Sequence, residues 1–399
     1  MHLSFSTEPP RAVRKYFNAS QGREQSQQHL VPTYLISAEV YAALFALMAM
    51  GLTLTYMTTK VPNFAYGDMV LLGVYTSYAM VKVYHWSPYE ASTLGFALAG
   101  LVSVAMYLLV LRPLARRGAS IVSLMIATFG VDIGFAGIFG IYTDFLANKY
   151  SFPDSKAFYT LGPDFTLAGY PGIDFAAPIA VAVVVLGIFV LLTRTKFGVT
   201  MRASIENPPL ARVLGINVDL VYTASWFLAG GLAGFAGTFL TLYLPFLSVN
   251  TGNDLIVGIF AASVLGGLTS IFGSAVGGVI IGGSEILMTI WLGSGFGYGG
   301  SFLIAAILLL SGAYMVRRKF TRSKVVGGIL AALGVWVIAD IAIGLPVDFL
   351  APELVNGFGS ANINPFQTGI PLVIMAAALL IVPRGIFSIN FRRLLRREK

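Results

Sequence analysis

The chain has 399 residues, of which 56% are hydrophobic and only 11% are charged, whereas about 25% of the residues of an ordinary soluble domain are charged. This composition indicates a membrane protein, and its formal charge of +8 is then attributed to basic cytoplasmic loops rather than to nucleic-acid binding. The absence of cysteine and the scattering of the three histidines along the chain argue against disulfides, redox chemistry and a metal centre.

The chain opens with a polar tail and continues as a series of apolar runs. Residues 1–30 are rich in Ser and Gln and do not resemble a signal peptide, so we expect a disordered tail. Runs of membrane-spanning length, roughly 17–25 residues each, follow at 33–56, 61–83, 91–111, 121–143, 175–193, 220–243, 254–270, 273–292, 301–316, 325–344 and 366–382. The sequence predicts an all-α polytopic membrane protein with about 10–11 transmembrane helices, in a transmembrane domain over residues 31–388.

Charge predicts the orientation of the loops. Most Lys and Arg residues fall in the segments 111–120, 194–217, 317–324 and 383–399, which should therefore face the cytoplasm. Within the last segment, residues 389–399 are expected to form a basic cytoplasmic tail. The loop at 144–174 contains four aspartates against two lysines and is placed outside.

The first helices give conflicting signals. Counting back from 111–120 places the N-terminus outside if every early segment spans, whereas Arg11, Arg14, Lys15 and Arg23 favour the cytoplasm. One early segment, around 57–70, is therefore predicted to be broken or re-entrant, which is tolerated only where backbone lines a cavity or packs on protein.

Glycine is dense at 228–237 and 265–283, where several pairs are spaced by four residues. Such spacing is typical of close helix packing in membranes. The alternative is a narrow pathway lined by exposed backbone.

Motifs for chemistry on this chain are absent. The sequence has no GxxxxGK[ST] phosphate loop, no HExxH pair and no GxSxG elbow in the required context. We therefore expect a non-enzymatic chain without a cofactor, whose energy source, if it is ATP, is bound by another subunit.

The segment RTKFGVTMRASIENPPLARVLGIN (194–217) interrupts the apolar pattern. Asn207 is a suitable N-cap, Pro208 fits the first helical position, and Gly215 suits the left-handed residue that ends a helix. Residues 208–214 are predicted to form a short capped helix, after a bend from 199–206. It would expose Val213 and Leu214 beside Arg212, Arg202 and Glu206, and docking to a partner and a plain solvated loop remain equal alternatives.

The same segment resembles a known family. The run MRASIENPPLARVLGINVDLVYTASWFLAGGLAGFAGTFL (201–240) is similar to the cytoplasmic loop and following helix of branched-chain amino acid ABC transporter permeases. VPNFAYGDMVLLGVY (61–75), VLGGLTSIFGSAVGGVIIGGSEIL (264–287) and LIVPRGIFS (380–388) resemble three further motifs of that family, in the same order. Residues 301–350 look like extra helices compared with shorter members.

The resemblance implies the permease subunit of an importer, a multi-pass protein of the cytoplasmic membrane that works by alternating access. It implies separate ATPase subunits that use ATP, an extracytoplasmic substrate-binding protein and a second permease subunit, with a heterodimer favoured. The loop residues that match the coupling motif are Arg202, Ala203, Glu206, Asn207, Ala211 and Gly215; the tandem prolines depart from it. The implied substrate is a branched-chain amino acid, with urea or another amide, another amino acid, a sugar or a nucleoside as alternatives.

Acidic residues inside apolar runs need a reason, because a charge at the bilayer centre costs on the order of 3 kcal/mol. Asn63 and Asp68 could meet a substrate ammonium at a broken helix, although Asp68 could also cap a helix or pair with Lys60. Asp132 is central in its run, whereas Asp254 is expected to cap a helix. The pathway candidates are Asn63, Tyr66, Asp68, Asp132, Gly266, Gly267 and Glu285, and Tyr66 stands where the family often has His or Gln.

A second hypothesis is a stand-alone channel or secondary transporter. Asp68 or Asp132 would then serve as a proton or ion site. The lack of a visible inverted repeat argues mildly against it.

Overall fold

The computed structural model describes residues 30–152, 155–159, 164–167, 170–244, 246–293 and 369–381. The chain divides into two compact units, one of residues 1–283 and 378–399 and the other of residues 284–377. The first unit contains most of the described chain. The predicted extra helices at 301–350, the tail at 1–29 and the basic segments 317–324 and 383–399 lie outside the described residues.

The fold is built almost entirely from helices, as the composition predicts. The long helices are α2 (Leu30–Thr59), α3 (Tyr66–Tyr84), α4 (Pro88–Met106), α6 (Ile121–Tyr150), α7 (Ile173–Arg194), α10 (Val218–Tyr243), α11 (Thr251–Gly266), α12 (Ile271–Gly293) and α17 (Gly369–Ile381). Each coincides with one of the predicted apolar runs. Among the described residues, six helices are long and apolar enough to cross a membrane.

Shorter elements join these helices. A π-helical turn, η1 (Tyr107–Leu111), links α4 to α5 (Arg112–Arg116), and α8 (Lys196–Glu206) and α9 (Pro208–Val213) follow α7. Two small antiparallel pairs complete the described fold, β1 (Ala157–Tyr159) with β4 (Phe246–Ser248) and β2 (Thr166–Leu167) with β3 (Tyr170–Pro171).

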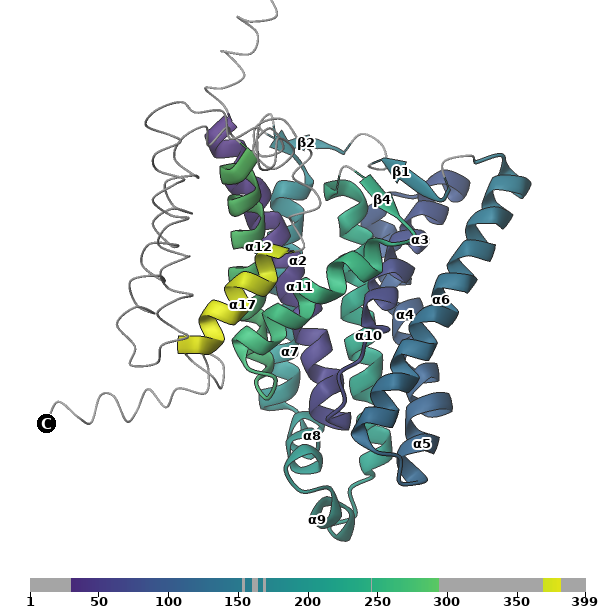
Figure 1. Cartoon of the computed structure of the whole chain (residues 1–399), viewed down its shortest axis with the longest axis vertical. Coiled ribbons are helices and arrows are strands. Elements are labelled where there is room, and N and C mark those ends of the chain that lie inside the picture. The colour runs from purple at the N-terminus through teal and green to yellow at the C-terminus, as the bar shows by residue number, and fades with distance from the viewer. Residues whose placement is uncertain are drawn as a thin grey trace, which may run out of the picture. The chain divides into compact units, whose positions relative to one another are not determined.

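The two ends of the first unit differ as the charge pattern predicts. Figure 1 shows α5, α8 and α9 at one end and the strands β1, β2 and β4 at the other. The basic segments 111–120 and 194–217 therefore share one side, opposite the acidic loop 144–174. The strand end is closed by a buried aromatic cluster in which Tyr75 and Tyr78 of α3 contact Phe158 of β1.

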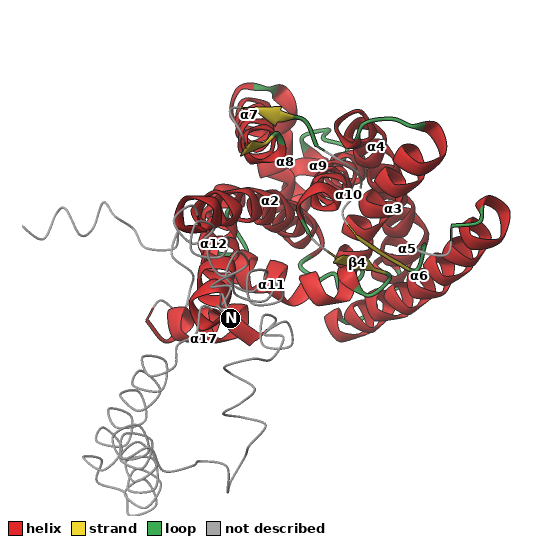
Figure 2. Cartoon of the chain, turned by 90° about the horizontal axis from the view of Figure 1, so that it is seen from above, coloured by secondary structure: helices red, strands yellow, loops and turns green. Residues whose placement is uncertain are grey.

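Helix α10 lies at the centre of the first unit, between α2 and the α3–α4 pair (Figure 2). A Cβ atom at Gly234 would lie 2.5 Å from the Ala99 Cβ of α4 and would collide with the carbonyl oxygen of Gly95, and a Cβ at Gly73 of α3 would collide with the backbone of Gly234. Glycine therefore lets the three backbones touch. The predicted packing role of the glycines at 228–237 is confirmed.

The glycines at 265–283 also serve packing. Gly277 and Gly273 face the backbone of α11, while Gly278 and Gly282 face Ala46 and Ala42 of α2. Here too, side chains would prevent the contact between helices.

The early segment is broken where the sequence predicts. Helix α2 ends at Thr59, residues 60–65 are not helical, and α3 starts at Tyr66. The later turns of α3 reach the end of the unit that carries the strands, where Tyr75 and Tyr78 belong to the buried aromatic cluster. The segment is thus a non-helical interruption between α2 and α3.

Candidate functional site

The non-helical stretch before α3 is wedged between α6 and α11. The Phe64 backbone N–H donates a hydrogen bond to the Thr128 hydroxyl of α6 at 3.3 Å. The Phe64 ring stacks on Phe129 with centroids 4.1 Å apart and meets Phe260 of α11 at 5.2 Å. These contacts hold an irregular backbone inside the bundle, where it is covered by protein.

Two acidic side chains meet just beyond this wedge. Asp68, in the first turn of α3, is 4% exposed, and its carboxyl group lies next to that of Asp132 on α6. Two adjacent carboxylates repel each other, and a proton shared between them or a cation beside them would relieve this repulsion. Asp132 follows Thr128 by one turn, so the same face of α6 meets both the wedge and the carboxyl pair.

The pair lies well inside the predicted membrane span. Asp132 is 11 residues from the start of α6 at Ile121, which corresponds to roughly 16 Å at 1.5 Å per residue. That is about half of a hydrocarbon core of roughly 30 Å. For a span whose hydrocarbon core starts at Ile121, the pair lies near the middle of that core.

The polar atoms around the break are incompletely satisfied. Asn63 is 1% exposed. Among the described residues no hydrogen-bond partner is found for either polar atom of its amide, for Asp68 Oδ2 or for Asp132 Oδ1. Buried polar atoms normally have partners, so a cluster of exceptions calls for an explanation such as a polar ligand. Lys60 is directed to the Tyr56 ring, 6.0 Å from its centroid.

Tyr66 is anchored to the scaffold. Its hydroxyl donates a hydrogen bond to the Ala229 carbonyl of α10 at 3.2 Å, and a Cβ atom at Gly51 of α2 would collide with it. The side chain is 1% exposed. Its position explains how the start of α3 is fixed to α10.

The remaining pathway candidates have other surroundings or belong to the second unit. Gly266 packs against Gly273, and Gly267 ends α11 with a φ of 97°. Glu285 is buried on α12 in the second unit. The structure thus brings together Asp68 and Asp132, next to Asn63 in the chain.

The expected cap at Asp254 is wrong in detail. The N-cap position of α11 is Asn250, without a side-chain cap, and Asp254 lies in the first turn. Thr251 instead accepts a hydrogen bond from the Ser248 N–H at 2.8 Å. An acid in the first turn still favours the helix dipole.

The basic segment after α7 forms two helices, and the predicted capped helix is confirmed. Asn207 Oδ1 accepts a hydrogen bond from the Leu210 N–H at 3.1 Å, Pro208 is the first residue of α9, and Gly215 has a φ of 80°. Upstream, α8 is a separate helix rather than an extension of α7, with the Thr195 hydroxyl accepting from the Gly198 N–H at 3.3 Å.

The exposed surface of α9 and its C-cap is mostly apolar, with Arg212 exposed beside it. Val213 is 83% exposed, Leu214 69% and Leu210 53%, whereas Ala211 is 1% exposed and faces inward. Arg202 is exposed on α8, as expected, and its guanidinium donates a hydrogen bond to the Leu192 carbonyl near the end of α7. The remaining coupling-motif residues Ala203 and Glu206 lie on α8.

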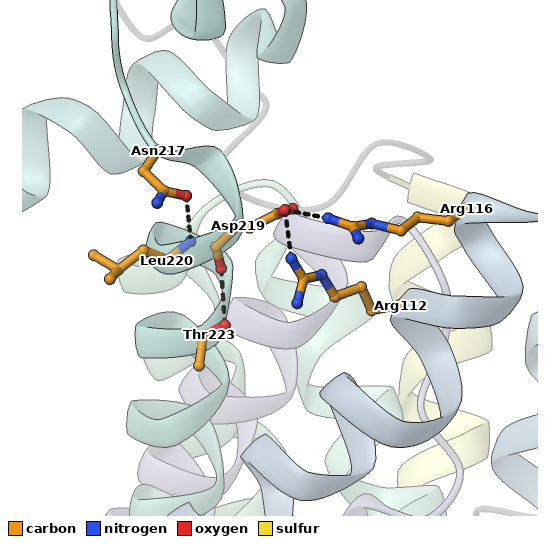
Figure 3. A network of polar contacts seen from close by, with 6 residues as sticks. All are labelled: Arg112, Arg116, Asn217, Asp219, Leu220 and Thr223. Atoms are coloured by element: carbon orange, nitrogen blue, oxygen red, sulfur yellow. Dashed lines mark hydrogen bonds and ion pairs between the residues drawn. The ribbon is translucent and has the colours of Figure 1, made fainter.

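An ion-pair cluster at the same end was not predicted. Asp219, in the first turn of α10, accepts hydrogen bonds from Arg112 at 2.6 Å and Arg116 at 2.5 Å on one carboxylate oxygen (Figure 3). In the sequence, the two arginines indicated only the orientation of their loop. The ion pairs could have been suspected because Asp219 begins a helix on the same predicted cytoplasmic side as the basic loop 111–120.

The chain was compared with known proteins. Residues 34–316 match the family described as branched-chain amino acid transport system, permease component. The chain is 42% identical over 265 residues to the probable branched-chain amino acid transport permease protein LivH of Methanocaldococcus jannaschii, covering 66% of this chain and 83% of the relative. It is 26% identical over 284 residues to the high-affinity branched-chain amino acid transport system permease LivH of Escherichia coli K12, covering 67% and 88%.

A more distant similarity covers a smaller region. The autoinducer 2 import system permease LsrC of Salmonella choleraesuis is 33% identical over 118 residues, which is 27% of this chain and 33% of that protein. No solved structure matches the chain.

Proposed function

The chain belongs to the family of branched-chain amino acid transport system permease components, and from this premise we propose that branched-chain amino acids cross the membrane through it by alternating access. It is a multi-pass membrane protein and a transport subunit of the ABC importer type. We place ATP hydrolysis on separate ATPase subunits, with no cofactor on this chain.

The observation that supports this function most directly is the interrupted helix with its mid-membrane carboxyl pair. Transporter sites are commonly formed where helices are discontinuous near the bilayer midplane. A zwitterionic amino acid would place its ammonium group against Asp68 and Asp132, and the Asn63 amide would supply a further polar contact. The phenylalanine rings around Phe64 would face an apolar side chain.

The α8–α9 pair is the proposed contact with the ATPase. Its exposed apolar residues Leu210, Val213 and Leu214 form a small hydrophobic surface on a capped helix, of the kind that fits a groove on a partner. Tyr222 of α10 donates a hydrogen bond to the Ser204 carbonyl of α8 at 3.0 Å. A push on the pair would therefore reach the central helix.

We propose two further partners, a second permease subunit, with a heterodimer favoured, and an extracytoplasmic binding protein. Helix α6 is the described surface best suited to the second subunit, because a Cβ atom at Gly130, Gly134, Gly137 or Gly140 would meet nothing within 4 Å. Gly130 and Gly134 are spaced by four residues, and such a spacing allows two membrane helices to approach closely.

The test is to purify the chain from its native membrane and then to measure uptake. A subunit with an ATP-binding motif should copurify, and deletion of residues 206–212 should abolish ATP-dependent uptake of leucine while membrane insertion persists. Undiminished uptake after the deletion would contradict the coupling role. Substrate flux through liposomes that contain this chain alone, abolished by Asp132→Asn, would instead support a stand-alone transporter.

A further inference from the structure

A cavity of about 370 Å³ opens at the α5–α9 end of the first unit, away from the Asp68–Asp132 pair. Five elements or their flanks form it, namely the end of α2, the η1–α5 turn, the start of α6, α9 and the start of α10. Its charged lining consists of Arg112, Arg116, Arg212 and Asp219. Three guanidinium groups against one carboxylate leave two positive charges in excess.

The arginines that line this cavity keep hydrogen-bonding capacity that the described residues do not satisfy. Arg112 and Arg116 share one oxygen of Asp219, and no hydrogen-bond partner of Arg112 Nε is found in the described part of the chain, although this atom is buried. Over the same residues Arg212 makes no salt bridge. Guanidinium groups in this state are suited to the oxygens of a phosphate, which can accept several hydrogen bonds at once.

The rest of the cavity wall is mostly apolar, with Thr58, Thr59 and Tyr222 as its uncharged polar members. Tyr107, Leu111 and Leu124 line the cavity. On the same helix ends Leu109 is 76% exposed and Val122 63%. The charge pattern places this end at the cytoplasmic leaflet.

We propose that this cavity binds the phosphate headgroup of an anionic lipid of the cytoplasmic leaflet. Basic pockets between membrane helices on the cytoplasmic side suit such headgroups. The arginines would hold the phosphate, while Leu111 and Leu124 would contact the first part of the acyl chains. Because Arg212 belongs to α9 and Arg112 begins α5, an occupied cavity would connect the proposed docking helix to α5.

The full-length chain in detergent should be titrated with dioctanoyl phosphatidylglycerol, dioctanoyl phosphatidylcholine and inorganic phosphate, with bound lipid counted by native mass spectrometry. Phosphatidylglycerol should bind most tightly, and Arg212→Gln should weaken its binding about fivefold. Arg212 is the first choice for substitution because it makes no salt bridge to other described residues, so its loss should spare the fold.

Arg117→Gln is the matched control, since Arg117 is exposed at the same end of the unit, just after α5, but does not line the cavity. Lipid binding by this variant should match that of the unmodified chain. Asp219→Asn should tighten binding, because it releases two guanidinium groups. Equal binding by Arg212→Gln and Arg117→Gln would overturn the site. Inorganic phosphate or phosphatidylcholine binding as tightly as phosphatidylglycerol would overturn the assignment to an anionic lipid.

Discussion

Asn207→Ala tests whether α9 must be a formed helix to couple this subunit to an ATPase. Helix α9 has only six residues, and isolated helices shorter than about 12 residues are marginal in water. Its N-terminus depends on the 3.1 Å hydrogen bond from the Leu210 N–H to Asn207 Oδ1. Asn217 caps α10 with the same 3.1 Å geometry at Leu220 (Figure 3), but α10 has 26 residues and is packed at the centre of the bundle.

Removing an asparagine cap costs about 1 kcal/mol, which corresponds to roughly a fivefold change in the equilibrium between formed and unformed α9. Asn207→Ala should therefore lower leucine uptake up to about fivefold in proteoliposomes that contain the whole importer, with unchanged membrane insertion. Asn217→Ala removes a similar hydrogen bond, but packing still stabilises α10, so leucine uptake by this variant should stay near normal. Asn207→Ser, which restores a cap, should recover uptake. Equal uptake by the two alanine variants would refute the reasoning.

Three further predictions concern packing, the carboxyl pair and the open face of α6. Gly234→Ala forces a Cβ atom against α4 and should lower the thermal midpoint in detergent by about 2–6 °C, from an overpacking cost of about 1–3 kcal/mol; Gly134→Ala, in open space, should not, and equal midpoints would contradict the packing. Asp68→Asn and Asp132→Asn should each reduce leucine uptake at least tenfold, for loss of charge-assisted hydrogen bonds of about 1.5–3 kcal/mol, and normal uptake by both would exclude the pair from the pathway. Since the chain has no cysteine, a single Gly134→Cys substitution should give a disulfide-linked product with a cysteine placed on the second permease subunit, whereas linkage only from the α7 side would contradict the proposed interface.

The helices and the α9 cap could be predicted because their signals are local. The length of an apolar run determines whether it spans the bilayer, and the residues from Asn207 to Gly215 contain both ends of one short helix. The break before α3 was predicted from a signal that covers several helices, namely the conflict between the helix count and the charge of the N-terminal tail.

The partners of the site residues could not be predicted in the same way. Asp68 and Asp132 are 64 residues apart in the numbering, and their contact depends on the rotation of α6 about its axis. A helix that is apolar around most of its circumference, as α6 is, does not specify which face turns inward. The same limit applies to Asp219, whose arginines lie on another helix more than 100 residues earlier.

The central helix α10 connects the two proposed sites physically. Its first turns meet the cytoplasmic elements through the Tyr222–Ser204 hydrogen bond and the Asp219 ion pairs. Near its middle, the Ala229 carbonyl accepts the Tyr66 hydroxyl hydrogen bond, and Tyr66 begins the helix that holds Asp68. Because glycine-mediated contacts join α10 to α3 and α4 without intervening side chains, a displacement of the α8–α9 pair cannot be absorbed by side-chain rearrangement alone. Such a displacement would therefore move the start of α3, and with it Asp68, relative to Asp132 on the peripheral helix α6.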